Sequence, residues 1–176
     1  MAEIVSIHAV SHTPVMINFP QAASPQAKSE VDRAFQKMGQ QVVKAQPDVL
    51  LMQETKMTDK VFPALAFGEM GYESAHFGQG QWNGVAIVSK VGLTDVQTNF
   101  AAGQPDAEAR IITATCGGVK VVSVYVPNGR ALDHEHYQYK LRWLDSLLTH
   151  VQTVAKPTDH LVVGGDFNIA PADIDV

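Results

Sequence analysis

Side chains that carry oxygen donors follow three short apolar runs of the chain. Glu54 follows the run 49–52, Tyr125 and Asn128 follow the run 121–124, and Asp166 and Asn168 follow the run 161–163. Sites in sheet proteins commonly form where strands end and loops begin, so these side chains are expected at one rim. Carboxylate and amide oxygens are hard ligands that suit Mg²⁺ or Mn²⁺ and not zinc. Beside a phosphate group, such a metal stabilises the charge that develops in a displacement.

The spacing of Asp166 and Asn168 permits two interpretations. If the preceding strand continues, both side chains project from one face, roughly 6.6 Å apart along the chain, and Phe167 points into apolar packing. Asp and Asn beside a glycine pair are also ordinary turn residues. A single Glu at a strand end is commonly solvated, and a Tyr such as Tyr125 is commonly a buried residue with a satisfied hydroxyl. The combination of these side chains at strand ends favours a site.

Strands and helices are expected to alternate along the chain. The predicted strands are 3–10, 49–52 (buried on both faces), 72–77, 84–89, 110–116, 119–126 and 160–164. The predicted helices are 25–46, between Ser24-Pro25 and Pro47, a short one near 60–67, and 133–153, with 12–25 as an irregular connection. In the last helix Asp133 is the expected N-cap, and the expected core face is Tyr137, Leu141, Leu144, Leu148 and Val151. The pattern indicates an α/β or α+β protein with a layered sheet core.

Composition limits the class of protein. The chain has 176 residues and a formal net charge of −5, with 45% hydrophobic residues, which fits one folded domain over 1–176 and excludes a disordered chain. The single Cys116 favours a reduced compartment. We expect a soluble cytoplasmic protein, because no apolar run is long enough to cross a membrane and residues 1–10 do not resemble a signal peptide. No obligate protein partner is evident.

Five strings of residues carry a family resemblance. They are 46–56 (QPDVLLMQETK), 82–87 (WNGVAI), 108–110 (EAR), 124–129 (VYVPNG) and 165–171 (GDFNIAP). In order and spacing they resemble the exonuclease III family of abasic-site endonucleases, within the endonuclease/exonuclease/phosphatase superfamily. The resemblance implies a four-layer α/β/β/α sandwich. It also implies Mg²⁺-dependent hydrolysis of double-stranded DNA, both 5′ to abasic sites and by 3′→5′ exonuclease action, with Mn²⁺ as an alternative metal.

The resemblance also implies a role for each matching residue. Glu54 would be a metal ligand, and Asp166 would orient or deprotonate the attacking water. Asn168 would hold the nucleophile or the transition-state oxygen, with Asp166 and Asn168 also near the metal. Tyr125 would contact the scissile phosphate. The supporting or DNA-contacting positions would be Lys56, Arg110 and Asn128.

Two departures from the family pattern leave other readings open. His8 stands where the family has an Asn that helps to hold the metal, and the sequence ends at Val176, soon after the GDFNIAP string. We therefore expect a sandwich that is incomplete at the C-terminus, in a chain whose activity is impaired. The alternatives are a non-catalytic remnant that binds DNA or a protein, and a related phosphodiesterase that acts on a lipid or nucleotide.

Overall fold

The computed structural model describes residues 39, 40, 42 and 44–170. It divides the chain into two compact units, Met1–Asp48 and Val49–Val176, and each is described by itself. In the first unit residues 39, 40, 42, 44 and 45 are helical, and the Gln46 N–H donates to the Val42 carbonyl at 2.8 Å. This agrees with the helix end predicted before Pro47. The predicted strand 3–10, the connection 12–25 and His8 lie outside the described residues.

The second unit begins with a three-stranded antiparallel sheet. Its strands are β1 (Val49–Gln53), β2 (Glu73–Phe77) and β3 (Val85–Ser89), in the order β1-β3-β2. The single helix predicted near 60–67 is instead two short elements, a 3-10 helix η1 (Asp59–Val61) and α2 (Ala64–Glu69). Pro63 between them explains the break, because proline has no N–H for a continuous helix and is accepted where a helix begins.

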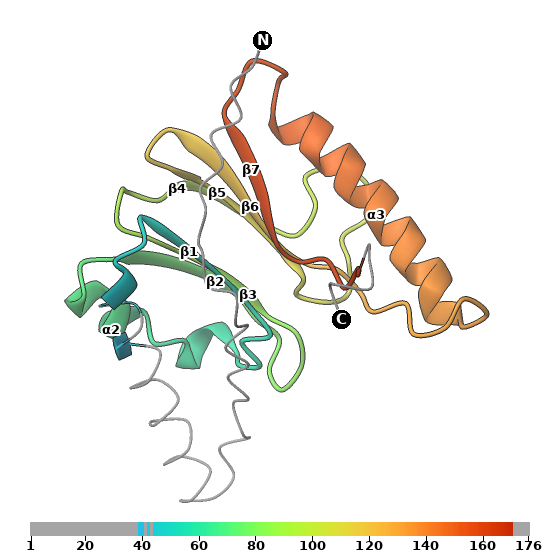
Figure 1. Ribbon diagram of the computed structural model, residues 1–176, viewed down its shortest axis with the longest axis horizontal. Helices are drawn as coiled ribbons and strands as arrows, with labels where there is room; N and C mark the ends of the chain where they lie inside the picture. The colour runs from blue at the N-terminus through green and yellow to red at the C-terminus, as the bar shows by residue number, and fades with distance from the viewer. Residues whose placement is uncertain (1–38, 41, 43, 171–176) are drawn as a thin grey trace, which may run out of the picture. The chain divides into compact units, whose positions relative to one another are not determined.

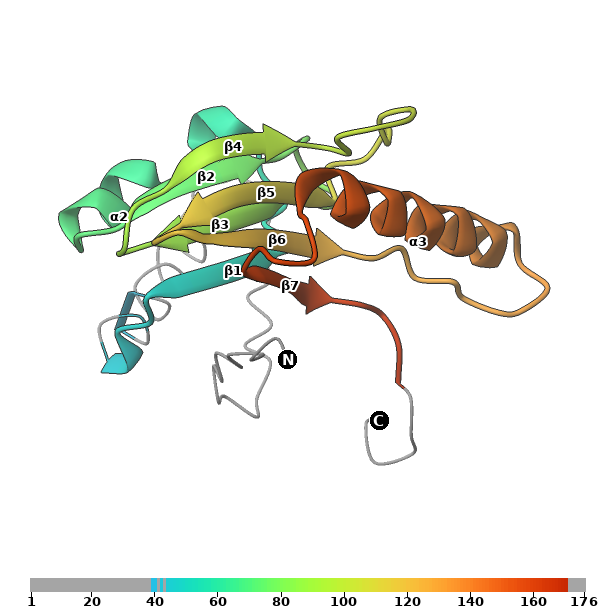
Figure 2. The same cartoon turned by 90° about the horizontal axis from the view of Figure 1, so that it is seen from above.

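A four-stranded sheet follows, in the order β4-β5-β6-β7. Its strands are β4 (Thr94–Thr98), β5 (Ile111–Cys116), β6 (Val119–Tyr125) and β7 (Leu161–Asp166). Strands β5 and β6 form the hairpin predicted at Gly117-Gly118, whereas β6 and β7 are parallel and are joined through α3 (Glu135–Val154) (Figure 2). Strand β4 was not predicted; its one apolar residue, Val96, is exposed.

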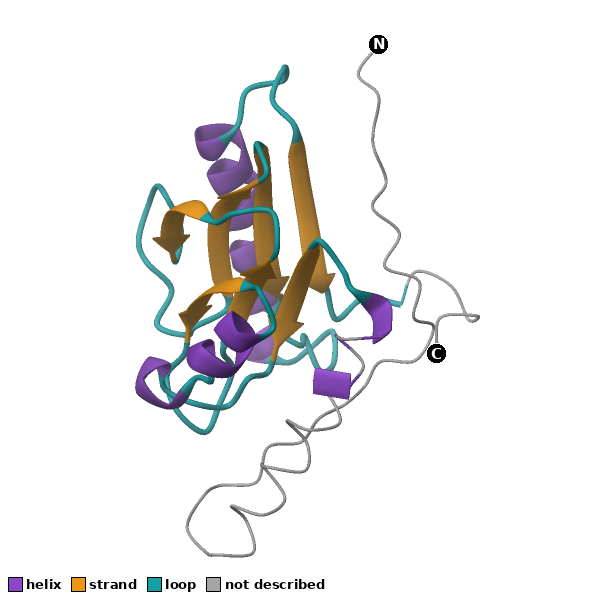
Figure 3. Ribbon diagram, turned by 90° about the vertical axis from the view of Figure 1, so that its left-hand side faces the viewer, coloured by secondary structure: helices purple, strands orange, loops and turns teal. Residues whose placement is uncertain are grey.

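Within this unit the two sheets lie between helices, with α2 beside the three-stranded sheet and α3 along the four-stranded one (Figures 1 and 3). Alternate residues of β5 and β6 supply two cores, as the period of a strand requires. The first core, between the sheets, contains Val85, Ile87, Ile112, Ala114, Cys116 and Val121. The second, beneath α3, contains Ile111, Val122, Val124, Val126, Trp143 and Leu147.

The buried face of α3 differs from the prediction. Its buried side chains are Lys140, Trp143, Leu147 and His150. Of the predicted core residues, Leu141 and Leu148 are exposed, at 40% and 59%. The buried His150 accepts a hydrogen bond from the Ala101 N–H at Nδ1 (2.9 Å) and pairs with Thr113 Oγ1 at Nε2 (2.8 Å). Polar side chains with such partners are compatible with burial. Leu144 and Val151 of the predicted face do pack against the core beneath α3, so the apolar stripe alone located the face only in part. The N-cap is His134 and not Asp133, because its ring accepts from the His136 N–H.

The glycine pair of β7 brings the end of this strand close to its neighbours. Gly165 has φ +138°, and an added Cβ would overlap the Val124 carbonyl; Gly118, with φ +83°, has open space around it. We expect Gly165→Ala to destabilise the fold by more than about 2 kcal/mol, since it adds a backbone clash to an unfavourable φ. Gly118→Ala, the control, carries only the conformational cost of a side chain at positive φ, about 1–2 kcal/mol. Urea unfolding of both variants measures this, and equal losses would contradict it.

Candidate active site

Glu54 lies in a turn directly after β1. Its backbone has φ +52°, and that of Lys56 has φ +51°. The Glu54 carboxylate accepts a hydrogen bond from the Tyr125 hydroxyl at 2.6 Å and forms an ion pair with Lys56 at 2.6 Å. Burial raises the pKa of Glu54, but the hydrogen bonds from Lys56 and Tyr125 outweigh it, so the net pKa lies below its ordinary value. Glu54 is therefore an anion held in one orientation at neutral pH.

Tyr125, the last residue of β6, lies between Glu54 and Arg110. The Arg110 guanidinium lies 4.7 Å from the centre of the Tyr125 ring and donates to the Tyr125 carbonyl at 3.2 Å. Burial, and then the hydrogen bond to Glu54, raise the pKa of Tyr125 well above its ordinary value. The phenol consequently stays protonated and remains a hydrogen-bond donor at any pH near neutrality.

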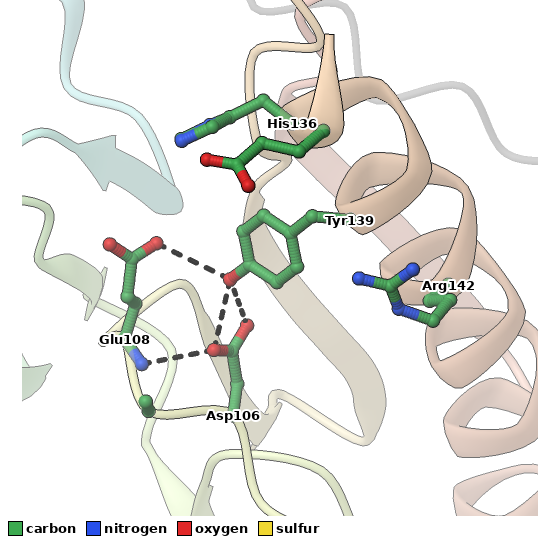
Figure 4. A pocket seen from close by; sticks show the side chains of 7 residues that line it. Asp106, Glu108, His136, Tyr139 and Arg142 are labelled. Atoms are coloured by element: carbon green, nitrogen blue, oxygen red, sulfur yellow. Dashed lines mark hydrogen bonds between the residues drawn. The ribbon is translucent and has the colours of Figure 1, made fainter.

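Arg110 is itself oriented by Glu108. The two form an ion pair of 2.5 Å. The same Glu108 oxygen accepts a hydrogen bond from the Tyr139 hydroxyl at 3.3 Å, and Tyr139 also donates to Asp106. Asp106, Glu108 and Tyr139 line a pocket between α3 and the 106–108 segment, with Tyr139 pointing toward both carboxylates (Figure 4). The contacts form a continuous chain from α3 through Arg110 to the ring of Tyr125.

Asp166 ends β7 beside Tyr125, its partner in the parallel register. The strand does not continue, and Asn168 has φ +50° with its N–H bonded to Asp166 Oδ1 at 2.8 Å. The projection of Asp166 and Asn168 from one strand face was therefore wrong, and the pair makes the turn contact that the alternative interpretation described. Phe167 packs in the core beneath α3, as predicted.

The side-chain amide of Asn168 is fixed by the segment that follows β6. Its Nδ2 donates to the Val126 carbonyl at 2.8 Å, and its Oδ1 accepts from Asn128 at 3.2 Å. Asp166 is exposed. The structure thus gathers Glu54, Tyr125, Asp166, Asn168 and Asn128 where β1, β6 and β7 end. Lys56 and Arg110 contact members of this group directly.

Sequence reasoning missed Lys140, because it lies within what looked like the apolar stripe of α3. Lys140 is 7% exposed and donates to the carbonyls of Phe167 and Asn168, at 3.3 and 2.6 Å. Burial lowers the pKa of Lys140, and the nearby Asp166 opposes that shift. No periodicity could have identified it, since its partners are backbone atoms of a distant turn.

We expect Lys140→Met to loosen the turn that carries Asp166 and Asn168. Methionine keeps the volume of the lysine stem, but it leaves two carbonyls without their charged donor, at a cost of about 1.5–3 kcal/mol. Amide exchange at Asn168 should accelerate more than exchange in β5. Arg142→Met, on the exposed face of the same helix, is the control. Unchanged exchange at Asn168 would contradict the assignment.

The donor set around Glu54 fits a hard divalent cation. Each Glu54 oxygen has one hydrogen-bond donor and keeps a further lone pair, and Asp166 and Asn168 add oxygen atoms. Among the described residues no three His, Cys, Asp or Glu side chains cluster as a metal-binding group. Such a cation would therefore complete its shell with water, amide and phosphate oxygens, as Mg²⁺ does.

Comparisons with known proteins identify the family of this fold. The model of the endonuclease/exonuclease/phosphatase family matches residues 18–176. The chain belongs to this family. Exodeoxyribonuclease III of Haemophilus influenzae is 31% identical over 140 residues, which cover 77% of this chain and 52% of that protein. The DNA repair nuclease APEX1 of Danio rerio is also 31% identical, over 77% of this chain and 44% of its own length.

Solved structures show the same family fold. An AP endonuclease from Archaeoglobus fulgidus superposes with a TM-score of 0.77 at 36% identity, over 83% of this chain and 56% of the other. A 3′ phosphatase from Neisseria, bound to a product DNA hairpin, gives a TM-score of 0.74 at 39% identity, over 81% and 56%. The family member described here spans about half the length of the curated relatives it matches. In its described part, no helix has the length and apolar character to span a membrane.

Proposed function

We propose that this chain carries the catalytic centre of a DNA-repair nuclease, a hydrolase that cleaves DNA phosphodiesters at abasic sites and removes nucleotides from 3′ ends. The observation that carries the proposal is the Glu54–Tyr125 hydrogen bond beside Asp166. It places a fixed carboxylate, a permanent phenol donor and a second carboxylate at the ends of three strands. The nuclease names of the relatives and the DNA hairpin of the Neisseria structure support a DNA substrate.

The metal in this proposal is Mg²⁺, with Mn²⁺ as a substitute. The relatives form a divalent-metal-dependent nuclease family. Glu54 would hold the ion, with Asp166 and Asn168 nearby. When bound, the ion supplies positive charge that stabilises the phosphate oxygens during displacement.

The protein's own side chains have the remaining roles in the proposed reaction. In the structure the Tyr125 hydroxyl donates its single proton to Glu54. Once an ion is bound by Glu54, this hydroxyl turns to donate to a phosphate oxygen instead, and its raised pKa keeps the proton in place. Asp166 orients the attacking water and accepts its proton, and the Asn168 amide holds that water in line. The P–O bond to the 3′ oxygen breaks as the water attacks, and the departing oxygen takes a proton from solvent. Lys56, Arg110 and Asn128 keep these groups in position, and Lys56 also faces the DNA backbone. We place the reaction in the cytoplasm, where the free Cys116 stays reduced.

A substrate panel tests the proposal. Because the chain covers about half of the Haemophilus relative, it is assayed both alone and joined to the remaining half of that protein. The substrates are an abasic duplex, an intact duplex and a small phosphodiester, and circular dichroism checks folding. We expect the abasic duplex to be cut fastest of the three substrates, and only when Mg²⁺ or Mn²⁺ is present. A folded hybrid that cuts none of them, or that prefers the small phosphodiester, would contradict the proposal.

A further inference from the structure

The turn after β1 holds an unusual backbone. Glu54 and Lys56 both lie in the left-handed region, with φ +52° and +51°, and the Thr55 between them has no exposed surface. Residues with side chains adopt this region at a cost, and they remain there only when their surroundings enforce it. Some set of contacts must therefore hold the turn that presents Glu54.

Backbone hydrogen bonds hold one side of the turn. The Thr55 N–H donates to the Gly84 carbonyl at 3.2 Å, and the Lys56 N–H donates to the Asn83 carbonyl at 2.9 Å. Gly84, with φ +96°, lies so close that a Cβ there would overlap Thr55 Oγ1. These hydrogen bonds fix the two amides, but none of them involves the Thr55 hydroxyl.

A chain of side chains holds the other side. Thr55 Oγ1 lies 2.7 Å from His76 Nε2, and His76 Nδ1 lies 2.8 Å from Asp59 Oδ1. His76 Nδ1 has no partner that meets hydrogen-bond geometry, so this second contact is mainly electrostatic. The Phe62 ring stacks on His76 with centroids 4.3 Å apart, and Asp59 also accepts the Gly78 N–H at 2.8 Å. Both ends of the imidazole are consequently restrained.

The carboxylate at Nδ1 selects the tautomer of His76. Its Nδ1 carries the hydrogen and faces Asp59, so Nε2 accepts a hydrogen bond from the Thr55 hydroxyl. Burial lowers the pKa of His76 despite the opposing effect of Asp59, which agrees with a neutral ring. The hydroxyl, imidazole and carboxylate are arranged as in hydrolases with a nucleophilic triad. Here, however, Thr55 is fully buried against Gly84, and no substrate can reach its oxygen.

We propose that Thr55, His76 and Asp59 form a positioning relay, which anchors the strained turn and so fixes the direction of the Glu54 carboxylate. Asp59 orients the imidazole, the imidazole holds the Thr55 hydroxyl, and Thr55 fixes the backbone on both sides of itself. None of the three touches the reacting atoms. The expected effect of this relay on metal affinity rests on the proposed function. Its expected effect on the rigidity of the backbone at residues 54–56 does not.

A pair of substitutions at Thr55 separates the hydroxyl from packing. Thr55→Val keeps the shape and removes the hydroxyl, whereas Thr55→Ser keeps the hydroxyl and removes a methyl group. Thr58→Val, the same change at an exposed position, is the control. In the full chain, amide exchange at residues 55 and 56 is measured by NMR, and Mn²⁺ affinity by calorimetry.

We expect Thr55→Val to accelerate exchange at residues 55 and 56 at least tenfold and to weaken Mn²⁺ binding by about 10–100-fold, the range for groups that orient metal ligands. For Thr55→Ser and Thr58→Val, both the exchange rates and the Mn²⁺ affinity should stay within about threefold of the parent chain. If Thr55→Val does not fold, His76→Phe, whose ring can still stack on Phe62, provides both readouts.

The outcomes distinguish the relay from the proposed function. Unchanged exchange in Thr55→Val, or an equal loss in Thr55→Ser, would overturn the relay, because the hydroxyl would then have no special part. Accelerated exchange with unchanged Mn²⁺ affinity would overturn its link to Glu54. A parent chain that binds no Mn²⁺ would contradict the proposed function instead, and the exchange rates would still decide the relay.

Discussion

Glu54→Gln is expected to abolish most of the stabilisation that Mg²⁺ or Mn²⁺ gives to the chain. An ion present at 100 times its dissociation constant adds about 2.7 kcal/mol, which corresponds to a rise of about 5–10 °C in melting temperature. Glutamine keeps the size of the side chain but removes the charge, so the ion loses its best ligand. Cleavage should fall by at least about 100-fold, or about 2.7 kcal/mol of transition-state stabilisation.

The control for this substitution is Glu69→Gln, which removes the same charge from an exposed position on α2. It should keep the full metal-dependent rise. Differential scanning calorimetry with the metal and with a chelator measures both variants. A rise that survives in Glu54→Gln would mean that the ions bind elsewhere, and the site described here would then not be a metal site.

Tyr125→Phe should lower the cleavage rate by about 10²–10³-fold even when metal is saturating, the range for removing one donor to a developing charge. The loss of its hydrogen bond to the Glu54 carboxylate should cost about 1.5–3 kcal/mol of stability. Because the pKa of Tyr125 is raised, the parent enzyme should show no loss of rate from its ionisation at pH 10, where an ordinary tyrosine is half ionised.

Tyr137→Phe, a half-buried tyrosine on α3, is the matched control. Its cleavage rate should equal that of the parent chain. Single-turnover cleavage over a range of metal concentrations separates weaker metal binding from a slower chemical step. Full recovery of the Tyr125→Phe rate at high metal concentration would show that the hydroxyl orients Glu54 and does nothing for the phosphate.

Much of the fold could be predicted because it depends on local pattern. The period-two alternation in 110–126 places Ile112 and Ala114 in one core and Ile111 in the other. The strand at 94–98 could not be found this way, because its residues are mostly exposed and polar. Strand β1, predicted as buried on both faces, is only partly buried. An apolar run indicates that a segment can be buried, but it does not show whether both faces of the strand are covered by other elements.

The sequence predicted which strand ends form the site, but not the hydrogen bonds that hold its side chains in place. Apolar strands followed by oxygen-bearing side chains placed Glu54, Tyr125 and Asp166 at one rim, and the structure brings them together. The contact of Thr55 with His76, 21 residues away, and the contact of Lys140 with Asn168, 28 residues away, have no local signature. Both depend on how the layers pack, which spacing along the chain does not encode.

The central claim is that Glu54, Tyr125, Asp166 and Asn168 form a metal-dependent centre for DNA cleavage. The most direct test is cleavage of a duplex with one abasic site by the hybrid with the Haemophilus half, with Mg²⁺ and with a chelator. We predict a single cut 5′ to the lesion that requires Mg²⁺ and disappears in Glu54→Gln. Cleavage that persists in the chelator, or that survives the loss of Glu54, would contradict the account.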